Sequence, residues 1–93
     1  MAAISGQKNV ATAGTELALG DQAINGPLMV KAKPANTGYM YLGNDGAGAV
    51  SSTTGLILAP GDAVVFAWVG NLATLLVDSS VNGEGVSWMA LNV

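Results

Sequence analysis

The chain has 93 residues and a formal net charge of −3, and it contains no histidine and no cysteine. Arginine is also missing, because the only basic residues are Lys8, Lys31 and Lys33. The three missing side chains carry most acid–base catalysis near neutral pH, thiol chemistry, soft-metal binding and bidentate phosphate recognition. We therefore expect one non-enzymatic domain with no cofactor, no metal and no nucleic-acid partner.

Hydrophobic residues make up 51% of the sequence and charged residues only 10%, whereas charged residues usually make up about 25%. A domain of this size has a large surface for its volume, so its interior cannot hold all of this apolar excess. We expect part of the excess to contact another copy of the chain, in a dimer, a trimer or a lattice.

The first 25 residues are irregular, with two apolar stretches, 10–13 and 16–19, on either side of Gly14. They form either short edge strands or an extended arm, and such an arm orders only when it docks on a partner. Under both interpretations, the larger apolar side chains of this segment are candidates for contact between subunits: Ile4, Val10, Leu17 and Leu19.

Residues 28–33 alternate between an apolar side, which includes Leu28 and Val30, and a side with Met29 and two lysines. This period of two predicts a half-buried strand. Residues 39–42 predict a second short strand, with Tyr39 and Tyr41 on one face. We expect these two tyrosines to lie at a rim or a subunit contact.

The second half of the chain continues in the same way. Residues 56–58 predict a strand that ends at Pro60-Gly61, a pair typical of a type II turn. The apolar residues 63–69 predict a central strand covered on both faces, and residues 72–77 predict another strand across the Gly70-Asn71 corner. Residues 86–93 alternate again, and the Asn82-Gly83 corner predicts a hairpin between the last two strands.

Turn signals thus recur about every ten residues, which is typical of an all-β sandwich or barrel. We expect a compact antiparallel β-sandwich or jelly-roll-like barrel of about seven or eight short strands. Residues 1–93 would form one β domain, in which 28–93 make the core sandwich and 1–25 an arm or edge strands. The uncharged stretch 63–77 is shorter than the roughly 20 residues of a membrane-spanning helix, so we expect no membrane partner.

The sequence gives little support for a catalytic or metal-binding site. Four carboxylates, Asp45, Asp62, Asp78 and Glu84, lie at or beside turns, where they hydrogen-bond to local backbone. Nothing in the sequence pairs two of them in a cleft, as hydrolysis requires. The Asn44-Asp45-Gly46 loop lacks the alternating acidic ligands of an EF-hand calcium site. We therefore expect no catalytic, metal-binding or cofactor-binding residue.

The aromatic side chains leave one alternative open. Trp68 and Trp88 lie on separate predicted strands, and core packing is the ordinary role of tryptophan in such strands. Exposed aromatic rings also stack on sugars or bases. A carbohydrate-binding β-sandwich that uses Tyr39, Tyr41 or Trp88 is therefore an alternative.

Four pieces of the sequence carry a resemblance to a known group of proteins. They are VKAKPANTGYMYLG from residue 30, GLILAPGDAVVF from residue 55, the Asn71-Leu72 step, and VSWMAL from residue 86. Together they resemble small structural proteins of tailed bacteriophages, which decorate (cement) the capsid or form the bases of head fibres. The resemblance implies a β-sandwich that oligomerises on the capsid exterior and fastens neighbouring major capsid subunits.

From the composition and the resemblance together, we expect a capsid decoration protein located on the outside of a virion. Its expected partners are the major capsid protein and further copies of itself. A neck, tail or fibre-base component of a virion is the second hypothesis. Since the chain has no arginine for bidentate ion pairs, we expect a mostly apolar or sheet-edge contact with these partners.

Overall fold

The computed structural model describes residues 2–44 and 50–92, which contain eight strands and one short 3₁₀ helix. The predicted all-β class is confirmed. The 3₁₀ helix η1 (Leu72–Thr74) lies between the sixth and seventh strands. The strands are β1 (Ala2–Val10), β2 (Leu17–Ala18), β3 (Leu28–Ala32), β4 (Met40–Gly43), β5 (Leu56–Leu58), β6 (Ala63–Phe66), β7 (Leu76–Ser79) and β8 (Glu84–Asn92).

The strands form two four-stranded antiparallel sheets, with the order β1-β8-β3-β6 in the first and β2-β7-β4-β5 in the second. Strand β1 pairs with β8, β2 with β7, β3 with β6, and β4 with β5. This nested pairing is that of one long hairpin rolled up into two sheets, which is the jelly-roll arrangement. The predicted sandwich is confirmed, and its strand order is that of a jelly roll.

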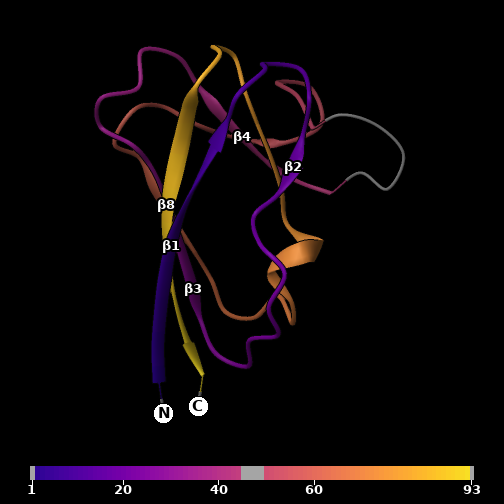
Figure 1. Ribbon diagram of the computed structural model, residues 1–93, viewed down its shortest axis with the longest axis vertical. Coiled ribbons are helices and arrows are strands. Elements are labelled where there is room, and N and C mark those ends of the chain that lie inside the picture. The colour runs from indigo at the N-terminus through magenta and orange to yellow at the C-terminus, as the bar shows by residue number, and fades with distance from the viewer. Residues whose placement is uncertain (1, 45–49, 93) are drawn as a thin grey trace.

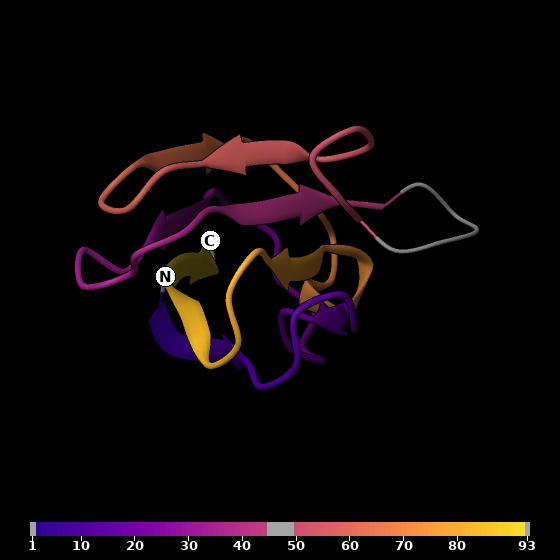
Figure 2. The ribbon, with the colours of Figure 1, turned by 90° about the horizontal axis from the view of Figure 1, so that it is seen from above.

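The first and last residues described lie beside each other at one end of the molecule (Figure 1), because the antiparallel register sets Ala2 opposite Asn92. Seen from above, β5 and β6 lie at one side and β1 and β2 at the other (Figure 2). Each side therefore has one edge strand from each sheet. With nine residues, β1 is much longer than the other three edge strands, which have two, three and four.

The core lies between the two sheets, and the alternation of β3 shows how the sequence builds it. Leu28, Val30 and Ala32 are fully buried, whereas Met29 and Lys31 are exposed on the opposite face. Met40 and Leu42 of β4 face them from the second sheet and are buried too. The other buried apolar residues of this cluster are Val10, Leu19, Ile24, Leu58, Leu72, Leu75, Val77, Val86 and Ala90.

The segment from 72 to 77 does not form the predicted strand. The Asn71 side chain accepts a hydrogen bond from the Ala73 N–H at 2.8 Å and caps η1, and β7 begins only at Leu76. The cap favours a helical turn because it binds a backbone donor that the helix leaves unpaired. Leu72 on this turn is buried and closes the core.

The predicted hairpin at the Asn82-Gly83 corner is absent, and the strands before and after Gly70-Asn71 do not pair either. Strand β6 belongs to the first sheet and β7 to the second, while β8 returns to the first. The chain therefore crosses between sheets at both corners. Gly70 and Gly83 do have the positive φ of turn residues, 81° each. The type II turn is confirmed, because Gly61 has a φ of 85° and the Asp62 N–H donates to the Ala59 carbonyl.

The prediction that 63–69 form a central strand covered on both faces is wrong. Strand β6 ends at Phe66 and lies at the edge of its sheet. Ala63 and Val65 are exposed, while Val64 and Phe66 on the other face are partly buried. A continuous apolar run is typical of a buried strand, but here one of its two faces has no covering element in the described residues.

The N-terminal segment forms edge strands, which is the first of its two predicted interpretations. Residues 2–10 form an edge strand whose nine residues all pair with β8, and 17–18 form an edge strand of the second sheet. The extended-arm interpretation does not apply to these residues. Val10 is fully buried and Leu19 nearly so, because both point into the core.

We predict that Leu28→Ala lowers the free energy of unfolding by about 2–5 kcal/mol, since it leaves a cavity in a fully packed core. Urea denaturation followed by tryptophan fluorescence measures the change. Met29→Ala, one residue further on and exposed, is the matched control and should cost much less. Equal losses for the two variants would contradict this assignment of the buried face.

Candidate functional site

The outer face of the first sheet carries an exposed row of apolar side chains. Strands β8, β3 and β6 place apolar side chains there. We call it the methionine face and define it by Ser5 and Gln7 of β1, Ser87, Met89 and Leu91 of β8, Met29 and Lys31 of β3, and Ala63 and Val65 of β6.

The register arranges these residues in rows across the sheet. In the first row, Ser5 lies opposite Met89, Met89 opposite Met29, and Met29 opposite Val65. Directly opposed side chains on one face have Cβ atoms about 4.5–5.5 Å apart. The three apolar members of this row therefore form one continuous strip.

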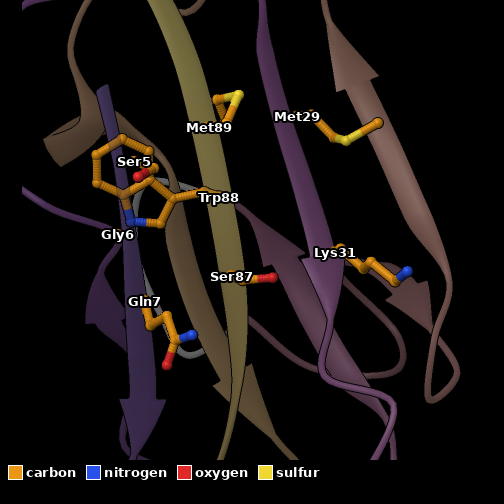
Figure 3. A pocket seen from close by; sticks show the side chains of 8 residues that line it. All are labelled: Ser5, Gly6, Gln7, Met29, Lys31, Ser87, Trp88 and Met89. Carbon is orange, nitrogen blue, oxygen red and sulfur yellow. The ribbon is translucent and has the colours of Figure 1, made fainter. Parts of the chain in front are cut away.

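The neighbouring row is more polar, because Gln7, Ser87, Lys31 and Ala63 lie opposite one another in that order. A shallow hollow of about 340 Å³ runs between the two rows. Figure 3 shows Met29 and Met89 at this hollow, with Ser87 and Lys31 below them. A second hollow of about 170 Å³ is lined by Pro27, Met29, Val65, Met89 and Leu91.

Trp88 lies at the β1 side of the first hollow (Figure 3). Its ring packs against the Gly6 backbone, so that a Cβ atom added to Gly6 would lie 2.8 Å from the ring. Glycine at this position therefore lets the indole cover the edge of the core. Trp88 is partly buried there and packs against the core cluster, as expected for a core aromatic. The same expectation is wrong for Trp68, which is 67% exposed.

The apolar strip is well exposed and continuous along one row of the sheet. Met29 is 47% exposed, Met89 54% and Val65 61%. An antiparallel sheet with one solvated face usually alternates apolar residues inside with polar residues outside. Exposed apolar side chains that adjoin on one face and have polar neighbours at their rim are typical of a contact surface.

Methionine suits an adaptable contact, because its unbranched thioether chain fits irregular partner surfaces. The hollows are shallow and open, and the polar side chains around them, from Ser5, Gln7, Ser87 and Lys31, do not include a carboxylate. The methionine face therefore has the chemistry of a binding surface, and its residues offer no acid–base pair.

The predicted contact residues divide into two groups. Val10 and Leu19 lie in the core, so we withdraw them as contact candidates. Ile4 and Leu17 are partly exposed on edge strands, and Ile4 also packs against the core. The residues of the methionine face were not among the predicted contact residues. The sequence did contain a signal for them, because the alternation of residues 28–33 and 86–91 places Met29 and Met89 on the side opposite the core.

Tyr39 and Tyr41 lie on the second sheet, away from the methionine face. Tyr39 precedes β4 and is 51% exposed, and Tyr41 is partly exposed opposite Ile57 of β5 and Asp78 of β7. Since Trp88 belongs to the first sheet, the three aromatic residues of the carbohydrate hypothesis do not gather at one place.

The carboxylates hold loops in position. Asp62 accepts a hydrogen bond from the nearby Ala59 N–H, as predicted for a turn residue. Asp78 is buried and accepts the N–H groups of Gly14 and Ser79, and Glu16 accepts the Val50 N–H. These bonds link distant loops to the strands. Asp45 and Gly46, from the loop considered above as a calcium site, lie outside the described residues.

Glu84, the first residue of β8, binds the turn before β4. Its carboxylate accepts the Thr37 N–H at 2.6 Å, the Thr37 hydroxyl at 2.9 Å and the Gly38 N–H at 2.8 Å. The Thr37 N–H is the largest cause that holds the pKa of Glu84 below its ordinary value of 4.5, and partial desolvation opposes it. Glu84 thus joins the two sheets at this end of the sandwich.

Within residues 2–44 and 50–92, no group of three or more acidic residues lies close enough to hold a metal ion. Every buried side-chain nitrogen and oxygen in the same residues has a hydrogen-bond partner. No helix in the described part of the chain is long and apolar enough to cross a membrane.

Comparison with protein-family models, with curated proteins and with solved structures gives no match to this chain. Its function is therefore inferred from its own residues and fold.

We predict that Glu84→Gln lowers the free energy of unfolding at neutral pH. It should also make the free energy of unfolding depend less on pH in the acidic range. A lowered pKa means that the Glu84 carboxylate stabilises the fold above its ordinary pKa. This contribution is lost as the pH falls below 4.5 and through the lowered value. Chemical denaturation from neutral to acidic pH measures it.

The difference between wild type and Glu84→Gln should therefore shrink as the solution becomes acidic. Asp21→Asn, at an exposed carboxylate, is the matched control. A constant difference at every pH would show that the loss comes from altered packing and not from the charge of Glu84.

Proposed function

We propose that this protein is a non-enzymatic capsid decoration protein, which binds the outer surface of a bacteriophage head and stabilises it. The observation that carries the proposal is the methionine face, where a well-packed sandwich leaves Met29, Met89 and Val65 exposed on one sheet. Its partners are the major capsid protein and further copies of the chain, and its location is the virion exterior.

The energetics of such a contact support the proposal. Burial of apolar surface contributes about 25 cal/mol per Å², and about 1.5–3 kcal/mol for a large side chain that becomes fully buried. A protein that acts by covering capsid joints needs this binding energy and no reactive group. The net charge of −3 also suits the outside of a capsid better than its DNA-lined interior.

The jelly-roll arrangement is compatible with this role, since viral capsid domains and lectins use it. This support is an analogy at the level of the fold, because one fold serves many functions. The resemblance of residues 30–91 to phage decoration and fibre-base proteins favours the viral setting over the lectin setting.

Two alternatives make different predictions. A neck, tail or fibre-base protein would use the same surface, but a dozen copies or fewer would be present in each particle, compared with hundreds for a decoration protein. A carbohydrate-binding module would depend on the exposed Tyr39 and its neighbour Tyr41. Tyr39→Ala and Tyr41→Ala would then abolish binding to a glycan array while leaving capsid binding unchanged.

We predict that Met89→Lys weakens binding to capsids of the parent virus at least about tenfold, because the charge cannot be buried against an apolar partner surface. Co-sedimentation with capsids that lack the protein measures the affinity. Ile57→Lys, at a residue exposed to a similar extent on the second sheet, is the matched control. Weaker binding for Ile57→Lys alone would assign the contact to the second sheet and contradict the proposal.

A further inference from the structure

Strand β1 is an unusually long open edge. It has nine residues and forms the free side of the first sheet, at the lower left of Figure 2. Natural β-proteins usually shorten, bend or interrupt such edges with proline or bulges. The register of β1 with β8 runs from Ala2 to Val10 without a bulge, and β1 contains no proline.

The hydrogen bonds on the far side of β8 determine which backbone groups of β1 are open. The Lys33 N–H donates to the Gly85 carbonyl and the Leu91 N–H donates to the Pro27 carbonyl, so odd-numbered residues of β8 bond to β3. Backbone groups of an antiparallel strand alternate between its two neighbours. Even-numbered residues of β8 therefore face β1.

The register then decides the direction of the groups on β1. Even-numbered residues of β1 lie opposite even-numbered residues of β8 and bond to them. The N–H and C=O groups of Ala3, Ser5, Gln7 and Asn9 point away from β8. No other strand of the described chain pairs with this edge. β1 thus presents four residues ready for a further antiparallel ladder.

We propose that the occupant of this edge is β1 of a second copy of the chain, in an antiparallel pair with two-fold symmetry. Alignment of residues 2–10 over their full length centres the pair on Gly6. Ser5 then lies opposite the partner's Gln7, and Ala3 opposite the partner's Asn9. All four open residues bond across the interface, and two-fold contacts of this kind match a surface with itself.

The side chains favour this register. Lys8 is the only charged residue of β1, and a lysine at an edge is a common guard against uncontrolled pairing. In the Gly6-centred register, Lys8 lies opposite the partner's Ile4. Its charge disfavours the shorter register that would place it opposite the partner's Lys8, because like charges directly opposed are destabilising. The lysine thus disfavours that shorter pair, and the full-length pair keeps the two lysines apart.

Such pairing would join the two first sheets into one sheet of eight strands. The two methionine faces would then lie on the same side of it and form one wide apolar surface. The role of this wide surface in capsid binding rests on the proposed function. The inference itself says how two copies of the chain associate. Its own test needs no capsid, so the two can fail separately.

Gln7→Pro tests the open edge. Proline lacks the N–H that Gln7 points outward, but it leaves every hydrogen bond to β8 in place. Edge strands tolerate proline at such a position. Each two-fold pair would lose two hydrogen bonds, so we expect the dissociation constant of the dimer to rise at least about tenfold. Light scattering over a range of concentrations measures it. Gln7→Ala, which keeps the backbone N–H, should associate like wild type.

Hydrogen exchange in wild type gives a second readout that does not depend on a variant. With rising concentration, the amides of Ser5, Gln7 and Asn9 should become protected, while those of Gly6 and Lys8 are protected throughout. A wild-type chain that stays monomeric, or a Gln7→Pro variant that still dimerises, would overturn the proposal. Protection of these amides only after capsid is added would overturn it too, and would assign the edge to a capsid strand.

Because the chain has no cysteine, introduced cysteines can report the register. A mixture of Ser5→Cys and Gln7→Cys chains should form a disulfide between subunits more readily than either variant alone. Only the Gly6-centred register sets these two positions directly opposite, within the Cα separation of about 4.4–6.8 Å that a disulfide needs. Preferential self-linking of Ser5→Cys would contradict this register.

Discussion

The packing of two four-stranded sheets against each other is the constraint on which the rest of this structure depends. Each strand points alternate side chains to opposite faces, and only one face of each sheet can be covered by the other sheet. Leu28 and Val30 fill the space between the sheets, while Met29 and Lys31 must lie outside. The exposed methionine face is therefore a consequence of the same alternation that builds the core.

The jelly-roll order adds a second constraint, because it makes the chain cross between the sheets at most of its corners. Carboxylates on the strands fix the connections that make these crossings, because they accept backbone N–H groups from them. Glu84 of β8 accepts the Thr37 N–H, and Asp78 of β7 accepts the Gly14 N–H. These carboxylates thus support the architecture of the described chain. Among the surfaces that the sandwich leaves exposed are an apolar strip on the first sheet and an open edge at β1.

These two surfaces complement each other in the role that we propose. An apolar face gives binding energy that needs no arginine, and a sheet edge gives directional hydrogen bonds from the backbone alone. A chain without arginine, histidine or cysteine has few other means to bind a partner specifically. In this proposal, a surface built from alternating strands supplies both contacts.

The sequence by itself determined the all-β class, the faces of residues 28–33 and 86–91, and the turn at Pro60-Gly61, because alternation and turn chemistry are local. It did not determine which strands pair. The apolar run 63–69 predicts a buried strand, yet Val65 is exposed because β6 lies at a sheet edge. Val10 and Leu19 belong to the core for the same kind of reason. Only the tertiary structure decided these points, since burial depends on which element covers a face, and that element lies far away in the sequence.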